Sequence, residues 1–291
     1  MTRVAAEAPP STVHVLGSGS MLAPFLIDRL AAPGRRTVAH GRSPPDGAAR
    51  RGDFEWRPGD ASRLAADAFG PVATVISLLP LWLTAELALK LHPSIHLIAL
   101  GSTSALYKGE SGDAAERELA RRLADAETAL AARGDGRTIL RTTMIYCEGR
   151  DANVSAIARF ARRWRCFPLA GTAGGLRQPI HADDVAAACV GAVDNPAARG
   201  RVFDLAGGET LSYRAMVERI IGALDRPAWP VTLPAGLLAA LLGGANLVRA
   251  GTYSPALFAR MNRDLVFDDA AARAVLGHRP RPFHPDFRGR L

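Results

Sequence analysis

Lysine is almost absent from this chain. Lys90 and Lys108 are its only lysines, whereas 34 residues are arginine, a pattern typical of a GC-rich bacterial genome. The basic residues are spread along the sequence, and the densest run is Arg-Arg-Trp-Arg at 162–165. The net charge of +8 and the pI of about 10.2 therefore predict an affinity for anionic ligands, and nucleic acid is not the expected partner.

Cysteine and long apolar runs are scarce too. The three cysteines, Cys147, Cys166 and Cys189, are not clustered and form no Cys-x-x-Cys pair, so neither a metal site nor a disulfide framework is expected. Such usage fits a reducing cytoplasm. No signal-like apolar region opens the chain, and the longest apolar run, Ala235–Leu242, is too short to span a bilayer. We therefore expect a cytoplasmic protein without stable membrane insertion. Residues 1–11 are expected to form a loose leader.

The first sequence signal that is present is a strand, a turn and a helix near the N-terminus. Thr12–Leu16 is an apolar strand pattern that runs directly into the small-residue turn Gly17–Ser20. A helix is predicted near Ser20–Ala31, because apolar side chains recur there at helical spacing. Such an arrangement places the pyrophosphate of a dinucleotide on the N-terminus of a helix.

The glycine pattern in this turn is incomplete. Gly17 and Gly19 fit the first two positions of Gly-x-Gly-x-x-Gly, but the third position is a leucine. In the alternative spacing, Gly-x-x-Gly-x-x-Gly, Ser20 and Ala23 replace the later glycines with small residues. The predicted cofactor contacts of the turn are Gly17, Gly19, Ser20 and Met21. The alternative is an ordinary strand–turn–helix that binds no ligand.

The end of the second predicted strand bears on the form of the dinucleotide. An NAD site places an acid about 20 residues after the glycine turn, but the strand Arg36–His40 is followed by Gly-Arg-Ser. The guanidinium of Arg42 can bind a 2′-phosphate in a bidentate manner, with His40 and Ser43 beside it. The sequence therefore favours NADP(H) over NAD(H). The alternative is that Arg42 is one of many surface arginines.

Strands and helices alternate through the first half of the chain. This alternation predicts an α/β fold with a Rossmann-type doubly wound parallel sheet, which binds ligands at the C-terminal ends of its strands. Strands are expected at 12–16, 36–40, 54–56, 72–77, 95–100 and 138–140, with helices after residue 60 and at 81–91 and 113–133.

The pattern changes after Tyr146. A helix is expected at 153–164, a glycine-rich loop at 167–177, a short strand at 178–181, a helix at 185–193, a strand at 202–205 and a helix at 211–224. Proline-rich connections follow. We predict an NAD(P)-binding domain at 1–150, to which 178–224 return, and a small C-terminal substrate-binding lobe formed by 151–177 and 225–291.

Five segments, in this order, resemble the extended and atypical short-chain dehydrogenase/reductase superfamily, the NAD-dependent epimerase/dehydratase group. They are Gly17-Ser-Gly-Ser-Met-Leu-Ala23, Gly59-Asp60, Gly101-Ser-Thr-Ser-Ala-Leu-Tyr107, Ile139-Leu-Arg-Thr-Thr-Met-Ile-Tyr146 and Gln178-Pro-Ile-His-Ala-Asp-Asp-Val185. The resemblance covers nearly the whole chain.

The resemblance implies a role for each matching residue. Gly17, Ser20 and Ala23 form the pyrophosphate turn. Asp60 hydrogen-bonds the adenine, Ser77 and Leu78 line the cofactor, and Ser104 matches the active-site Ser/Thr. Beyond the sixth strand, a set of residues belongs to the substrate side, namely Thr143, Tyr146, Arg177 and His181. Asp183 and Asp184 are expected to cap a helix.

The catalytic Tyr-x-x-x-Lys pair of the family is missing. The helical segment 116–127, where it would lie, contains neither tyrosine nor lysine. Tyr107 and Lys108 lie just after the strand that leads to Ser104 and are the candidate replacements. The remaining option is that the reaction needs no side-chain proton donor. We therefore expect an NADP(H)-dependent oxidoreductase that acts on a small organic substrate of sugar or natural-product type. The alternatives are a non-redox isomerase, cyclase or lyase on the same scaffold, and a non-catalytic NADP-binding regulator or subunit. A homodimer is left open.

Overall fold

The computed structural model describes residues 11–46, 53–69, 73–234, 236 and 259–291. The expected leader and most of the apolar run 235–242 lie outside these residues. The chain divides into two compact units. The first unit comprises Met1–Gly101, Asp125–Leu140 and Ala186–Val202, and the second unit comprises Ser102–Ala124, Arg141–Val185 and Phe203–Leu291.

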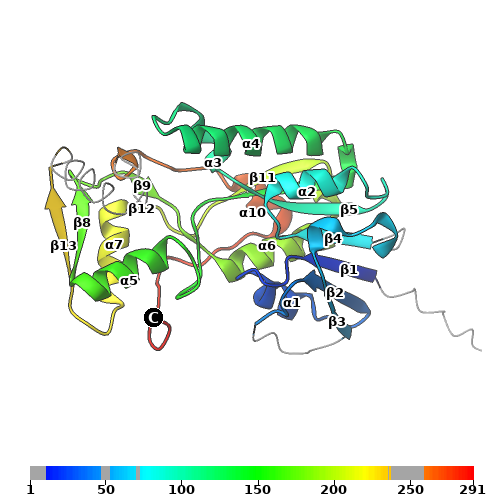
Figure 1. The fold of residues 1–291 in the computed structure, drawn as a ribbon, viewed down its shortest axis with the longest axis horizontal. Helices are drawn as coiled ribbons and strands as arrows, with labels where there is room; N and C mark the ends of the chain where they lie inside the picture. The colour runs from blue at the N-terminus through cyan, green and yellow to red at the C-terminus, as the bar shows by residue number, and fades with distance from the viewer. Residues whose placement is uncertain (1–10, 47–52, 70–72, 235, 237–258) are drawn as a thin grey trace, which may run out of the picture. The chain divides into compact units, whose positions relative to one another are not determined.

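A seven-stranded sheet with the order β11-β6-β5-β4-β1-β2-β3 organises the fold (Figure 1). The pairs β1–β2, β2–β3, β1–β4 and β4–β5 are parallel. The chain leaves β1 in one direction and returns beyond it with β4, so the strand order reverses between these two strands. In such sheets the crevice at the reversal is the usual ligand site. The strands are β1 Ser11–Leu16, β2 Arg35–Gly41, β3 Asp53–Pro58, β4 Ala73–Ser77, β5 His96–Ser102, β6 Arg137–Thr142 and β11 Arg201–Leu205.

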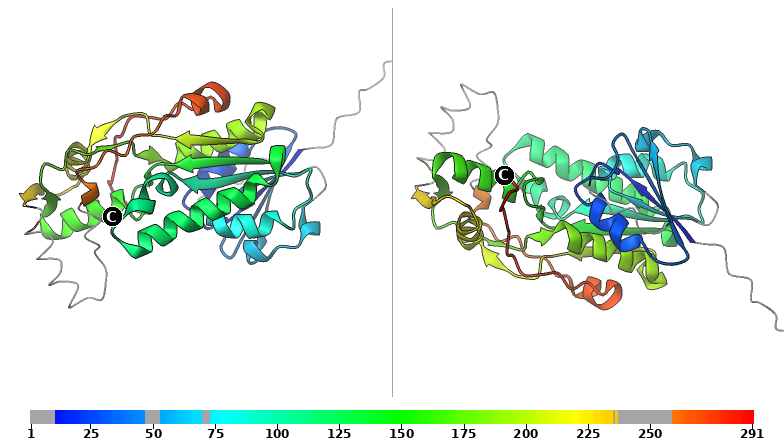
Figure 2. Two further views of the ribbon diagram at one scale, coloured as in Figure 1. Left: turned by 90° about the horizontal axis from the view of Figure 1, so that it is seen from above. Right: turned by 90° about the horizontal axis from the view of Figure 1, so that it is seen from below.

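Helices cover both faces of this sheet. The helix α1 (Ala23–Leu30) lies on one face together with α6 (Ala182–Asp194), whereas α2 (Leu81–Ala88) and the second half of α4 (Ala114–Ala131) lie on the other (Figures 1 and 2). The central strands are buried on both faces because they are nearly all apolar, as expected for a parallel sheet. The Rossmann-type α/β fold predicted from the sequence is therefore confirmed.

Two local predictions were wrong. The helix expected after residue 60 is replaced by two short 3₁₀ turns, Ala61–Arg63 and Ala66–Ala68. The expected loop at 167–177 contains the strands β8 (Cys166–Ala170) and β9 (Leu176–Arg177). Their partners lie far along the chain, since β8 pairs with β13 (Trp229–Leu233) and β9 with β12 (Leu211–Ser212). Neither pairing has a local sequence signal.

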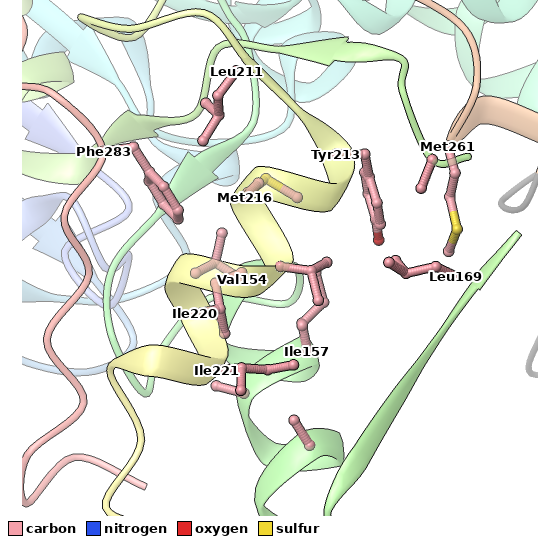
Figure 3. Packing of buried hydrophobic residues seen from close by; sticks show 14 of the residues in the cluster. Val154, Ile157, Leu169, Leu211, Tyr213, Met216, Ile220, Ile221, Met261 and Phe283 are labelled. Carbon is pink, nitrogen blue, oxygen red and sulfur yellow. The ribbon is translucent and has the colours of Figure 1, made fainter. Parts of the chain in front are cut away.

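The second unit has its own apolar core. Val154 and Ile157 of α5 (Val154–Trp164) pack against Met216 and Ile220 of α7 (Tyr213–Gly222), and Phe283 from the C-terminal segment lies at the same cluster (Figure 3). The remaining elements of this unit are short: α3 Ser104–Tyr107, the 3₁₀ turn η3 Lys108–Glu110, β7 Ile145–Tyr146, β10 Ile180–His181 and α10 Ala270–Leu276. In the part of the chain described, no helix is both long and apolar enough to cross a membrane.

The guanidinium of Arg133 closes the C-terminal end of α2. Its Nη1 donates to the carbonyls of Ala88 and Leu91 at 2.9 and 3.3 Å, and its Nη2 to those of His92 and Ile95 at 3.1 and 3.0 Å. The last carbonyls of a helix have no partner within the helix. Arg133 therefore satisfies both the helix end and the turn that leads into β5.

Replacing Arg133 with alanine is expected to lower the free energy of unfolding by about 2–4 kcal/mol, because partly buried carbonyls lose a charged donor. The free energy of unfolding of Arg133→Lys should lie between those of the wild type and Arg133→Ala, since an ammonium cannot reach all four carbonyls at once. Urea unfolding followed by circular dichroism measures the effect. Arg63→Ala is the control, because Arg63 is exposed, and should change stability by less than about 0.5 kcal/mol. A similar small change for Arg133→Ala would contradict this account.

Candidate functional site

The glycine turn after β1 is fixed to the end of β2. The amides of Gly17 and Ser18 donate to the carbonyl of His40 at 2.9 and 3.0 Å, and the hydroxyl of Ser18 donates to the carbonyl of Ser43 at 2.5 Å. Gly17 has a φ of 88°, a conformation that costs other residues energy. A side chain there would also meet Leu78, which follows β4. The turn therefore lies at the crevice where the strand order reverses.

Amides in this turn are available to a ligand. Within the described ranges, the amides of Gly19 and Met21 have no hydrogen-bond partner. Both precede α1, whose positive N-terminal end favours an anion. Ser20 accepts a hydrogen bond from the amide of Leu22 at 3.3 Å. The residues present fit the pyrophosphate of a dinucleotide, which needs free amide donors at a helix N-terminus.

The position before Arg42 has no room for a side chain. A Cβ atom at Gly41 would lie 2.2 Å from the hydroxyl oxygen of Ser18 and 2.9 Å from its backbone nitrogen. An acid therefore cannot be accommodated at the end of β2. Arg42 is exposed, and the hydrogen bonds and ion pairs of the described residues leave its guanidinium unengaged. Its charge contributes to lowering the pKa of Asp60, although the hydrogen bond from Ser62 is the main cause.

Other predicted cofactor residues have partners of their own. The hydroxyl of Ser77 is fully buried and lies 2.7 Å from the hydroxyl of Thr84 in α2. The amide of Leu78 donates to the carbonyl of Leu16 at 2.9 Å. The carboxylate of Asp60 accepts from the amide and the hydroxyl of Ser62 at 3.0 and 2.7 Å. Roles for these three residues at the cofactor stay predictions.

The side chain of His40, which the sequence analysis placed beside Arg42 at the 2′-phosphate, instead forms a buried pair with His14. His14 and His40 lie on neighbouring strands, with His14 Nδ1 2.9 Å from His40 Nε2, and Phe69 packs against both rings. Both side chains are buried. The pKa of each is lowered to about 4, mainly by burial, with a smaller contribution from Arg57 for both and from His40 and Arg36 for His14. The pair is therefore neutral at physiological pH, and the His40 carbonyl holds the turn.

In the second unit, Ser104, Tyr107 and Lys108 share one turn of the chain. The hydroxyls of Ser104 and Tyr107 are 3.4 Å apart, and the amide of Lys108 donates to the carbonyl of Ser104. The ammonium of Lys108 lies 3.5 Å from the carboxylate of Glu116 in α4. The structure thus brings the three predicted catalytic residues together.

The predicted substrate residues hold the second unit together. Thr143 donates its hydroxyl to the carbonyl of Gln178 at 2.5 Å. Tyr146 is 1% exposed and packs against His181 and Phe283, and its burial raises the pKa of its hydroxyl. Arg177 is buried, and its guanidinium donates to three backbone carbonyls, those of Leu176, Arg260 and Arg263. Contact of these residues with a substrate stays a prediction.

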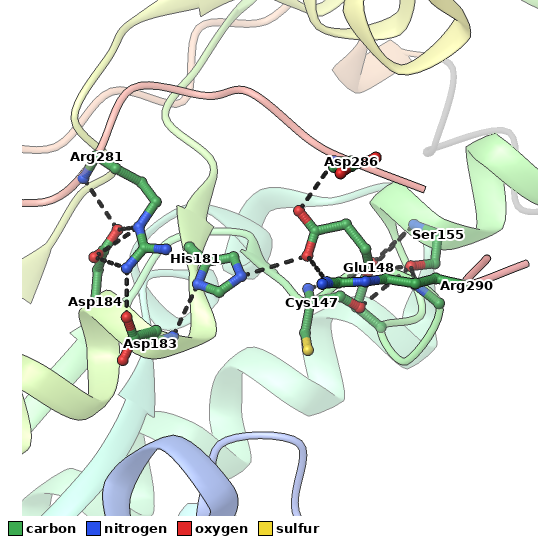
Figure 4. Close-up of polar contacts among 11 residues, drawn as sticks. Cys147, Glu148, Ser155, His181, Asp183, Asp184, Arg281, Asp286 and Arg290 are labelled. Carbon is green, nitrogen blue, oxygen red and sulfur yellow. Dashed lines mark hydrogen bonds and ion pairs between the residues drawn. The ribbon is translucent and has the colours of Figure 1, made fainter. Parts of the chain in front are cut away.

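Two ion-pair groups, in which exposed arginines contact carboxylates that are mostly buried, were missed by the sequence analysis (Figure 4). Glu148 lies 3.4 Å from His181 Nε2 and 3.5 Å from Arg290. Burial alone would raise the pKa of Glu148, but the hydrogen bond from His181 and other partners lower it. Asp183 and Asp184, in the first turn of α6, pair with Arg281. Glutamate and arginine look like solvated surface residues in a sequence, so only the fold reveals these pairs.

Two other kinds of group bear on the chemistry of the chain, namely the Cys147 thiol and possible metal ligands. Burial raises the pKa of the Cys147 thiol, which makes it a poor nucleophile at neutral pH. Among the residues that the structure describes, no group of three His, Cys, Asp or Glu side chains could hold a metal ion.

Comparisons with known proteins agree on the fold. No family model matches the chain. A UDP-glucose 4-epimerase from Vibrio cholerae is 25% identical over 145 residues, which are 49% of this chain and 41% of that enzyme. The chain thus matches less than half the length of this curated relative. The UDP-glucuronic acid 4-epimerase from Bacillus cereus, solved in complex with NAD, has a TM-score of 0.70 at 13% identity, with 94% of each chain covered. MoeE5, solved with UDP-glucose and NAD, has a TM-score of 0.66 at 18% identity, also with 94% of each chain covered.

These similarities concern the fold of nearly the whole chain and the sequence of part of it. The chain resembles members of the extended short-chain dehydrogenase/reductases, the NAD-dependent epimerase/dehydratase group, in sequence over 49% of its length and in fold over nearly all of it. The resemblance predicted from the five sequence segments is confirmed.

Proposed function

We propose that this chain is an NADP(H)-dependent oxidoreductase that acts on a small substrate of sugar or related type. The observation that carries the proposal is the turn after β1, which presents the free amides of Gly19 and Met21 before α1 in the crevice beside β4. The similar sequence is that of a UDP-glucose 4-epimerase, and the two similar structures, a UDP-glucuronic acid 4-epimerase and MoeE5, were both solved with NAD. These relatives support a nicotinamide-dependent enzyme with a sugar-type substrate.

The phosphorylated form of the cofactor is favoured by the end of β2. An NAD site has a carboxylate that accepts a hydrogen bond from the adenosine ribose. At the end of β2, where this carboxylate would lie, Ser18 occupies the space that a side chain at position 41 would need. The next residue, Arg42, offers an exposed guanidinium that can bind a 2′-phosphate. NAD in the solved relatives is compatible with this proposal, because a single residue at the strand end selects the cofactor form.

The turn Ser104–Lys108 is proposed to handle the proton. A bound nicotinamide supplies hydride transfer chemistry. The Tyr107 hydroxyl donates a proton to the substrate oxygen as it is reduced, and takes it back in the reverse direction. Ser104 hydrogen-bonds the same oxygen, and the ammonium of Lys108 stabilises negative charge that develops there. The pair of hydroxyls 3.4 Å apart supports this assignment.

A second candidate function is a non-redox isomerisation, cyclisation or elimination on the same scaffold. The observation that favours it is α4, which contains neither tyrosine nor lysine along Ala114–Ala131. Product formed by enzyme that has been stripped of nicotinamide would select this candidate over the redox reaction.

Replacing Tyr107 with phenylalanine is expected to lower kcat/KM about 100-fold, which is the typical contribution of a positioned general acid. The affinity for NADPH should not change, because Tyr107 belongs to the second unit and the glycine turn to the first. Turnover of NADPH with UDP-sugars, followed by nicotinamide absorbance, measures the rate, and fluorescence titration measures the affinity. Wild-type turnover by Tyr107→Phe would show that another group carries the proton.

A further inference from the structure

Glu116 is the most strongly engaged carboxylate near the proposed catalytic turn. Its side chain is 13% exposed, and it lies in the first turn of α4. Its Oε2 accepts from the hydroxyl of Ser111 at 2.7 Å. Its Oε1 lies 3.5 Å from the ammonium of Lys108 and accepts from the guanidinium of Arg260. One carboxylate therefore binds two cations, each of which is mostly buried.

We propose that Glu116 is a positioning residue, which holds the ammonium of Lys108 in a fixed place at the start of α4, next in sequence to the turn that contains Ser104 and Tyr107. This inference rests on the proposed function for the role of Lys108. Lys108 is fixed at two points, because its amide caps α3 through the carbonyl of Ser104 and its ammonium contacts Glu116. A lysine side chain otherwise samples many rotamers, so a second anchor sets where its charge lies.

The charges around Glu116 keep it ionised. Burial alone would raise its pKa, but the hydrogen bond from Ser111 and the cations of Arg260 and Lys108 together lower it. The negative charge also lies in the first turn of a helix, where the helix dipole favours it. Because two cations share Oε1, the cluster of Lys108, Arg260 and Glu116 keeps one net positive charge next to the proposed substrate oxygen.

The scarcity of lysine makes this inference testable without a substrate. In a Lys90→Arg background, Lys108 is the only lysine of the chain, so its acylation by an N-hydroxysuccinimide ester can be followed by mass spectrometry of one peptide. Glu116→Gln keeps the shape and the acceptor for Ser111 but removes the charge. The rate of Lys108 acylation is expected to rise about fivefold, as for the loss of one ion pair of modest strength.

Glu118→Gln is the matched control, because it makes the same charge change on the same helix. Glu118 pairs with Arg121 on an exposed face, so its loss should leave Lys108 acylation unchanged. An unchanged rate in Glu116→Gln, or an equal rise in Glu118→Gln, would overturn the inference. If Glu116→Gln does not fold by circular dichroism, Glu116→Asp, which withdraws the charge by one methylene, should give an intermediate rise, and an unchanged rate there overturns the inference too.

Turnover separates this inference from the proposed function. In Glu116→Gln, kcat is expected to fall about tenfold while the KM for NADPH stays unchanged, since a mispositioned charge acts at the reacting atoms only. Faster acylation of Lys108 in a chain that binds no NADPH would support the positioning role and refute the oxidoreductase. If Glu116→Gln and Glu118→Gln have equal kcat while acylation of Lys108 is faster in Glu116→Gln, then Glu116 holds Lys108 but Lys108 takes no part in the reaction, which overturns the positioning role in catalysis.

Discussion

Alanine at position 41 is expected to weaken NADPH binding about 100-fold, or about 2.7 kcal/mol, within the usual cost of overpacking. The added Cβ would lie 2.2 Å from the Ser18 hydroxyl and 2.9 Å from the Ser18 amide nitrogen. The Ser18 side chain could rotate away from the new Cβ, but the Ser18 backbone nitrogen could not. The turn would therefore have to move away from β2. The hydrogen bonds from Gly17 and Ser18 to the His40 carbonyl would then be strained or lost. The free amides of the turn would no longer point together at the phosphates.

Isothermal titration with NADPH measures this loss, and two further variants define its cause. Gly222→Ala is the control, because a Cβ at Gly222 meets nothing within 4 Å, and it should bind NADPH like the wild type. Ser18→Gly combined with Gly41→Ala removes the hydroxyl that makes the closest contact, and should recover part of the affinity. Wild-type affinity in Gly41→Ala alone would mean that the turn does not form the dinucleotide site.

Acid is expected to destabilise the first unit well before its carboxylates are protonated. His14, His40 and His96 are buried, and burial lowers the pKa of each to about 4, from 6.5 for an exposed imidazole. Because the folded pKa is the lower one, the unfolded chain binds more protons between these values. Stability is therefore fully present above pH 6.5 and falls as the pH approaches 4. Each imidazole contributes a loss of about 2 kcal/mol between about pH 7.5 and about pH 5.

Urea unfolding at several pH values between these limits tests this expectation. Glu55 does not mask it, because its pKa is 4.5 when unperturbed and is lowered to about 2 here, mainly by the hydrogen bond from Arg57, so both values lie below the window. His96→Gln can keep the hydrogen bond to Thr138, which His96 makes at 2.8 Å, but cannot be protonated. The pH dependence of this variant should be weaker by about one imidazole, or about 2 kcal/mol. Equal stability at the two ends of the window in the wild type would contradict the buried neutral state of these histidines.

The sequence predicts the first unit well because the signals there are local. An apolar strand that runs into Gly17 and a helix with apolar residues at regular spacing need no distant partner to be recognised. The strands β8 and β13 were not predicted. About 60 residues separate them, and the pairing of two such distant strands leaves no local pattern in the sequence. The 3₁₀ turns after Asp60 were predicted as a helix because alanine favours helices, whereas the Asp60 side chain caps a single turn there.

The sequence identified residues of the candidate site but not the contacts that hold them in place. Ser104, Tyr107 and Lys108 are adjacent in sequence, so their proximity followed directly. Glu116 could not be assigned, because a glutamate at the start of a charged helix has the pattern of a solvated face. Its partner Arg260 is 144 residues away. Tyr146 and Arg177 were expected on the substrate side, and the structure shows both engaged in the packing of the second unit.

We infer that the turn after β1 and the arginine after β2 bind a phosphorylated dinucleotide. Isothermal titration of the full chain with NADPH and NADH, side by side, measures this binding. We expect saturable binding of NADPH, about tenfold tighter than that of NADH, and loss of this preference in Arg42→Ala. Tighter binding of NADH, or no heat from either cofactor at millimolar concentration, would contradict it.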